Sequence, residues 1–152
     1  MTRDRGSRDA RRGQAVAEFA LALIPLLLLI FGIFDLGRGI YLYNGVAEAS
    51  REIARVTIVH PYDTCCTLGT SSDALATIAQ QERVIPGLDG SGIAISCVDI
   101  ADTTVAPASC TPSSSVKVFV KVRVTVSWTP ASPLLVWLGA LDVSSVARME
   151  LQ

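Results

Sequence analysis

This 152-residue chain contains four cysteines, and what they can do depends on which of them the fold brings together. Cys65 and Cys66 are adjacent, whereas Cys97 and Cys110 follow further along. Four thiolates can bind zinc or form two disulfides. The C-x2-C spacing of zinc sites is absent, and adjacent cysteines could not readily supply two corners of one tetrahedron. The spacing favours two disulfides, and because a vicinal disulfide is strained, we expect the adjacent cysteines to pair separately with the two later ones.

The other ionisable residues do not form a recognisable catalytic set. His60 is the only histidine, and the sequence contains no G-x-S-x-G, no glycine-rich phosphate loop and no H-E-x-x-H. Asp99 and Asp102 are typical of a strand end and a loop. Glu18 and Asp35 flank an apolar run and so cannot form a paired-carboxylate site within one molecule. We therefore expect no enzymatic activity, no cofactor, no metal site and no small-molecule substrate.

That apolar run, residues 14–34, organises the rest of the chain. No charged residue lies between Phe19 and Phe34, and the run has the length of about 20 residues that crosses a hydrocarbon core. From Leu26 to Ile30 it is apolar on all sides, whereas a buried helix of a soluble protein, the alternative, normally keeps a polar face. An ionised Glu18 would cost about 3 kcal/mol at mid-bilayer and less near the interface. The run predicts a membrane helix whose acid needs a partner.

The start of this run resembles the prepilin signature, and in particular that of the TadE-like pseudopilins of tight-adherence pili. The resemblance depends on Gly13 and Gln14, followed by Glu18 and Phe19. In that family a membrane aspartyl peptidase cuts after the glycine, which leaves the acid fifth in the mature chain; Tyr is commoner than Phe after it. The resemblance extends to four further features, which are Pro25, residues 32–35, the ASREIAR segment at 49–55 and the SSVARMEL segment at 144–151.

The resemblance implies a structural role as a minor pilin or pseudopilin that a prepilin peptidase processes. The implied partners are other pilins and pseudopilins, the pilus assembly platform and its ATPase. It also implies that Glu18 pairs with the new α-amine on Gln14 of a neighbouring subunit during assembly. Two alternatives stay open: an uncleaved, signal-anchored subunit of another envelope complex, and a tethered exported binding protein or hydrolase.

The first 13 residues hold five arginines and two aspartates and no large apolar residue after Met1. Arg11 and Arg12 directly precede the predicted cleavage site, and arginines beside a span stay in the cytoplasm. This predicts a single-pass inner-membrane protein with a cytoplasmic N-terminus and an extracytoplasmic C-terminal domain, before any entry into the pilus. We expect the bond after Gly13 to lie in unstructured backbone. Without an aromatic residue to stack on bases, the leader is not expected to bind nucleic acid.

Beyond the span, apolar residues keep a helical spacing to residue 59, where His60 and Pro61 should end the helix. Pro25 should kink it, because proline removes a backbone hydrogen bond. A short helix should follow, capped by Ser71 or Ser72 and ending near residue 85. We expect the apolar face of this second helix to cover a sheet.

Three segments predict strands: residues 93–100, 116–128 and 143–151. In the second, every even-numbered residue is Val or Trp, so one face should be core and the other water. Residues 134–138 form an apolar turn too short to cross a bilayer. The expected fold is α+β and membrane-anchored, a long N-terminal transmembrane helix followed by a small pilin-like domain with one short helix and about three antiparallel strands. Its parts are a leader (1–13), the span (14–34), a helical extension (35–60) and the extracytoplasmic domain (61–152).

Overall fold

The computed structural model describes residues 4–61, 67–106, 110–111, 117–132 and 135–151, and it describes their side chains from Gly13 onward except that of Leu138. The chain divides into two compact units. The first consists of residues 1–38 and 130–139, and the second of residues 39–129 and 140–152. Each unit is described by itself.

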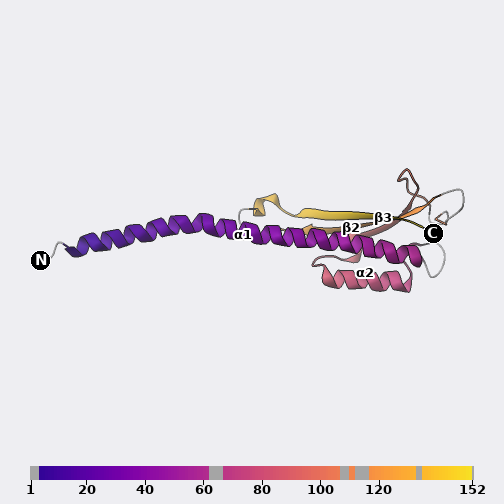
Figure 1. The fold of residues 1–152 in the computed structure, drawn as a ribbon, viewed down its shortest axis with the longest axis horizontal. Coiled ribbons are helices and arrows are strands. Elements are labelled where there is room, and N and C mark those ends of the chain that lie inside the picture. Colours follow the sequence, from indigo (N-terminus) through magenta and orange to yellow (C-terminus); the bar gives the residue numbers. More distant parts are fainter. Residues whose placement is uncertain (1–3, 62–66, 107–109, 112–116, 133–134, 152) are drawn as a thin grey trace. The chain divides into compact units, whose positions relative to one another are not determined.

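One long helix, α1 (Asp4–Val59), contributes to both units (Figure 1). It passes through Pro25 and ends where the sequence predicts, directly before His60. In the first unit its large apolar side chains are exposed around the helix, as at Phe19, which is 66% exposed. Within the described residues, α1 is the one helix long and apolar enough to cross a membrane. Exposing these apolar side chains to water is unfavourable, whereas exposing them to lipid is not. The fold is therefore that of a membrane-anchored α+β protein.

The second unit contains a three-stranded antiparallel sheet in the order β1 (Ile93–Val98), β2 (Phe119–Trp128) and β3 (Leu141–Glu150). The central strand places Val122 opposite Ile95 of β1 and opposite Ala147 of β3. The three predicted strands are therefore confirmed. β1 ends two residues earlier than predicted, because the chain turns at residues 99–102.

The core of the second unit lies between β2 and the part of α1 after residue 38. The even-numbered valines from Val118 to Val126 are all buried, as the alternation predicts. They share one cluster with α1 residues at helical spacing, which are Leu42, Val46, Ala49 and Ile53. Burying each such side chain is worth about 1.5–3 kcal/mol, so this contact fixes the sheet on the helix.

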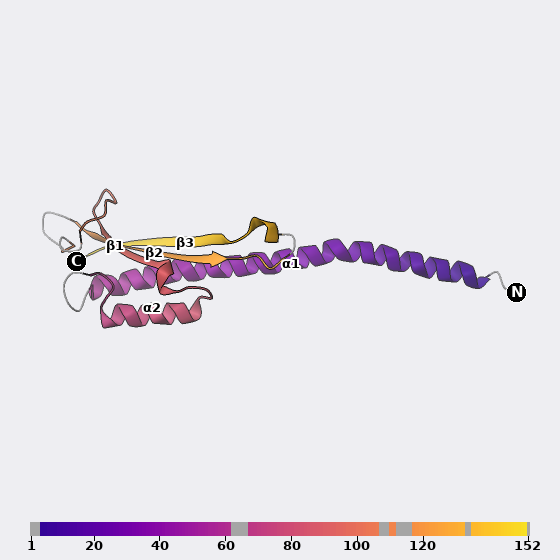
Figure 2. The same ribbon diagram turned by 180° about the vertical axis from the view of Figure 1, so that it is seen from behind.

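The second helix, α2 (Ser72–Val84), begins at an N-cap that the sequence predicts. The hydroxyl of Ser71 accepts the backbone N–H of Ala74 at 3.2 Å. The expectation that α2 covers the sheet is wrong, because α1 supplies that cover. The helix lies beside the C-terminal part of α1 (Figure 2), where Ile78 packs at the margin of the core and Leu75 is 54% exposed. The apolar face of α1 is longer, and it excludes α2 from the valines of β2.

Cys97 and Cys110 form a disulfide with their Cα atoms 6.0 Å apart. The expected separate pairing of these two cysteines with Cys65 and Cys66 is therefore wrong. After β1 the chain reverses, and the N–H of Val105 donates to the carbonyl of Cys97 at 2.9 Å. This return brings the following residues back beside β1, within reach of Cys97. Cys65 and Cys66 lie outside the described residues, and with Cys97 and Cys110 paired, the second disulfide left open within the chain is the strained vicinal one between them.

Candidate functional site

The predicted processing and assembly residues all lie on α1. Gln14, Glu18 and Phe19 are exposed, and the amide of Gln14 donates to the Glu18 carboxylate at 2.9 Å across one helical turn. Arg11 and Arg12 continue the helix, and their side chains lie outside the described part. In the uncut chain the acid therefore accepts a hydrogen bond from a neutral group on its own helix.

The bond after Gly13 is helical, so the expectation of unstructured backbone at this point is wrong. Residues 4–12 contain no proline, and their alanine and arginines are good helix formers, so the helix of the apolar run extends into them. A Cβ at Gly13 would meet no atom within 4 Å. The peptide bond is therefore held by helical hydrogen bonds and not by packing.

Asp35 forms a polar site that sequence reasoning missed. Its residue is only 2% exposed, and its two carboxylate oxygens accept the backbone N–H groups of Ala131 at 3.0 Å and Ser132 at 2.8 Å. The guanidinium of Arg38 lies 3.9 Å from the same carboxylate. All four residues belong to the first unit. The sequence offered one signal, an acid directly after the span, but it gave no indication of a partner almost a hundred residues away.

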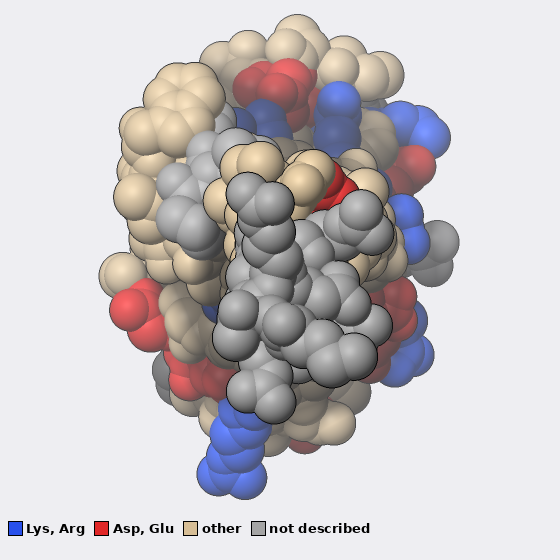
Figure 3. Space-filling view, turned by 90° about the vertical axis from the view of Figure 1, so that its left-hand side faces the viewer, with Lys and Arg blue, Asp and Glu red and all other residues tan. Residues whose placement is uncertain are grey.

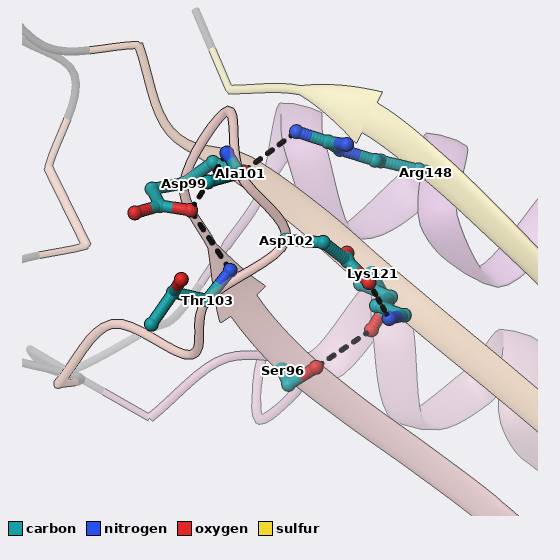
Figure 4. A network of polar contacts seen from close by, with 7 residues as sticks. All are labelled: Ser96, Asp99, Ala101, Asp102, Thr103, Lys121 and Arg148. Atoms are coloured by element: carbon teal, nitrogen blue, oxygen red, sulfur yellow. Dashed lines mark hydrogen bonds and ion pairs between the residues drawn. The ribbon is translucent and has the colours of Figure 1, made fainter.

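Asp99 and Asp102 organise the turn after β1 (Figure 4). The carboxylate of Asp99 accepts the N–H groups of Ala101 at 2.9 Å and Thr103 at 2.8 Å. Asp102 has a positive φ of 66° and pairs with the ammonium group of Lys121 on β2. That hydrogen bond holds the pKa of the Asp102 carboxyl below its ordinary value. The two acids therefore act within a turn, as their sequence positions predict.

Arg148 of β3 completes this cluster. Its guanidinium donates to the carbonyl of Asp99 at 2.6 Å and stacks over the ring of Phe119, 4.1 Å from the ring centre. The turn is thus held by groups from β2 and from β3. This arrangement ties the β1 end of the sheet to its opposite edge strand.

His60 lies where α1 ends and α2 begins. Its Nδ1 is 3.2 Å from a carboxylate oxygen of Asp73, and both side chains are more than half exposed. They line an open depression of about 380 Å³ together with Arg55 and Val59. Among the described residues, no three His, Cys, Asp or Glu side chains group as a metal would require. The histidine joins two helix ends, in agreement with its interpretation as a helix-end residue.

Charged residues of both signs are interspersed on the face seen in Figure 3, with uncharged residues between them. Proteins that bind nucleic acid gather lysines and arginines on one face. The coloured part of this face has mixed charge.

Residues 13–55 match the family model described as TadE-like protein. Over these residues the chain is TadE-like. The resemblance predicted from Gly13 and Glu18 is thereby confirmed, and the match continues through the ASREIAR segment of α1. No curated protein and no solved structure matches the chain.

TadE-like proteins are a family of structural pilus components, and the matched segment suggests a pilus-associated, pilin-like component. Within the part of the chain that the structure describes, the long apolar helix near the N-terminus suggests a single-pass membrane anchor. The matched residues include the part of α1 that is exposed and apolar and the part that packs on the sheet. The family segment thus contains both the anchor and the helix on which the second unit is built.

Proposed function

We propose that this chain is a minor pilin or pseudopilin of a tight-adherence pilus, cut after Gly13 by a prepilin peptidase and then passed to the assembly machinery. The observation that carries the proposal is the TadE-like match over residues 13–55, which begins at the glycine of the cleavage site. Glu18 supports it, because an exposed acid on an apolar helix provides a specific contact for another subunit.

Cleavage requires that the helix open around the scissile bond, since peptidases bind extended backbone. Gly13 makes this opening easier, because glycine is about 1 kcal/mol less favourable than alanine in a helix interior. No side chain packs over this position. We infer that the helix unwinds from its N-terminal end as far as Gly13, which exposes the bond while the span stays helical.

Cutting after Gly13 would create an α-amine on Gln14, whose reference pKa is about 7.7. In the uncut chain, the nearest polar partner of Glu18 is the neutral amide of that same Gln14. A cationic amine from a neighbouring subunit would compensate the carboxylate where the amide does not. A subunit docked at the wrong axial height would leave the charge unpaired in an apolar surround, so the pair also sets the register of assembly.

In this topology residues 1–13 lie in the cytoplasm and residues 14–34 cross the membrane. Residues 35–60 are the helical extension, and residues 61–152 form the extracytoplasmic domain. The arginines of the leader support this orientation. So does the disulfide between Cys97 and Cys110, because disulfides persist in oxidising compartments. Protease added to spheroplasts should digest the C-terminal domain; a protected domain with a cut leader would reverse the orientation.

The decisive experiment is the determination of the mature N-terminus on protein from piliated cells. We expect it at Gln14, and we expect Gly13→Leu to retain Met1. Gly37→Leu is the matched control, because a Cβ there also meets nothing within 4 Å. It should be cut normally. A full-length terminus on the unmodified chain would support the uncleaved anchor instead.

A further inference from the structure

The segment between β2 and β3 is fixed to α1 at the point where the predicted span ends. Asp35, the first residue after that span, accepts two consecutive backbone N–H groups from Ala131 and Ser132. Ser132 is buried as completely as Asp35. The segment Pro130–Gly139 and residues 1–38 form one compact unit, so this part of the chain belongs with the span.

Next along this segment, two large apolar side chains are directed outward. The short helix η3 (Val136–Leu138) leaves Trp137 79% exposed and Val136 62% exposed. Figure 1 shows η3 as the gold coil that precedes β3. Together, the two adjacent exposed side chains form an apolar surface on a segment that Asp35 fixes to α1.

The position of Trp137 indicates what covers it. Tryptophan is enriched where membranes meet water, because its ring is apolar and its indole N–H can still bond to headgroups or water. Within the same unit, Phe34 at the end of the span is exposed as well. The apolar surface of η3 thus lies in the same compact unit as the apolar stretch of α1, which ends at the polar Asp35. A bilayer that surrounds the span has its interface at that end.

Backbone chemistry favours the same occupant. Exposed N–H groups are penalised near hydrocarbon, and Asp35 satisfies two of those in this segment. Pro130 and Pro133 carry no N–H. In η3 itself, the N–H of Val136 donates to the carbonyl of Ser132 at 3.1 Å. Five described N–H groups of the segment are therefore bonded within the chain before it enters the headgroup region, those of Ala131, Ser132, Leu135, Val136 and Gly139.

We propose that η3 is a second membrane contact of this protein, in which Trp137 and Val136 insert into the lipid interface at the end of the span, with Asp35 holding the segment there. The contact depends on the membrane anchor and not on the proposed role in a pilus. It would hold the C-terminal domain close to the bilayer while the subunit is stored in the membrane. Release from lipid would then free the same apolar surface.

The test uses the full chain in phosphatidylcholine vesicles that contain lipids brominated near the headgroup or deep in the acyl chain. Trp128→Phe leaves Trp137 as the only tryptophan, and Trp137→Phe leaves Trp128 as the matched control. We expect shallow bromine to quench Trp137 more strongly than deep bromine, and aqueous iodide to quench it weakly. Trp128 lies beside Gly39 of α1 but is partly buried in the second unit, so shallow bromine should quench it less than Trp137.

The Asp35→Ala variant tests whether the hydrogen bonds to Asp35 hold Trp137 in the lipid interface. We expect this variant to lose quenching of Trp137 by bromine and to gain quenching by iodide, whereas Glu48→Ala, an exposed acid later on α1, should change neither. Formation of the Cys97–Cys110 disulfide checks that each variant folds. Fluorotryptophan in a chain with both tryptophans gives a second readout that needs no substitution at position 128.

Three results would overturn the inference. If the chain floats with vesicles and iodide alone quenches Trp137, η3 faces water and the proposal fails while the anchor stands. If Trp137 becomes protected only when other pilin subunits are added, its partner is a protein. If the chain does not float with vesicles at all, the membrane anchor itself is wrong, and the inference fails with it.

Discussion

The carboxylate of Asp35 accepts the backbone N–H of Ser132 at 2.8 Å, although the two residues are 97 positions apart in the chain. Together with the bond to Ala131, this contact attaches the segment between β2 and β3 to the first part of α1. The acid that directly follows the apolar run is therefore a structural anchor point. Its removal should affect this segment first.

We predict that Asp35→Ala accelerates amide hydrogen exchange in residues 130–139 by roughly tenfold or more, because two charge-assisted hydrogen bonds are lost. Hydrogen exchange with mass spectrometry measures this directly. Glu48→Ala should leave the exchange of this segment unchanged. Equal exchange in the Asp35 variant and the unmodified chain would mean that other contacts hold the segment.

Two glycines should respond oppositely to alanine. A Cβ at Gly92 would lie 2.4 Å from the backbone oxygen of Thr125 in β2, so Gly92→Ala must move the sheet and should destabilise the second unit by about 1–3 kcal/mol. Gly37→Ala meets no neighbour on α1 and should stabilise the helix by about 1 kcal/mol. Thermal unfolding in detergent compares the two variants. A tolerated Gly92→Ala would contradict the close approach to β2.

Cys97 and Cys110 are 13 residues apart in the sequence. A disulfide that closes a loop of this size stabilises the folded chain by about 3 kcal/mol, because it restricts the unfolded chain. We predict that replacing both cysteines by serine lowers the unfolding free energy by about that amount. Non-reducing peptide mapping should recover these two residues in one linked pair. Alkylation of the native protein tests whether Cys65 and Cys66 are oxidised as well, because an alkylated Cys65 or Cys66 would show free thiols there. Linkage of Cys97 to either of them would contradict the observed pairing.

Asp102 should make stability depend on pH. Its hydrogen bond to Lys121 lowers its pKa below the ordinary value of 3.8, so the folded chain releases this proton more readily than the unfolded one. The resulting stabilisation is present above pH 3.8 and is lost as the pH falls through the lowered pKa. Asp102→Asn should flatten this acid limb of the stability curve.

The asparagine variant is suitable because asparagine tolerates the positive φ at this position. Glu48→Gln, which removes one exposed carboxylate elsewhere on the chain, serves as the matched charge control. Urea unfolding over a series of pH values gives the curves. If Asp102→Asn and the unmodified chain lose stability in parallel on acidification, the Lys121 pair does not carry the effect.

Substitutions of Glu18 should impair pilus assembly without impairing membrane insertion. We predict that Glu18→Gln and Glu18→Leu insert in the membrane and are cut normally, because neither variant adds a charge to the span. Both should enter pili less often, since neither can neutralise a neighbouring α-amine. Co-purification with other pilins and counts of pili per cell measure this. Undiminished piliation in both variants would leave Glu18 without a role in assembly.

The sequence alone determined the elements of this protein, because their signals are local. An unbroken apolar run predicts a membrane helix, and the alternation of valines from Val118 to Val126 predicts which face of β2 is buried. The serine at position 71 and the prolines after α1 and α2 mark helix ends by their own backbone chemistry. The TadE-like signature is equally local, since it depends on residues within one stretch of helix.

Only the tertiary structure decided which distant segments meet. The helix that covers the sheet is α1 and not α2, because the longer apolar face of α1 packs on the valines of β2. The pairing of Cys97 with Cys110 depended on the return of the chain after β1, which spacing cannot encode. The carboxylate of Asp35 binds backbone N–H groups, which every residue except proline carries. No side-chain pattern in the sequence could therefore reveal its partners.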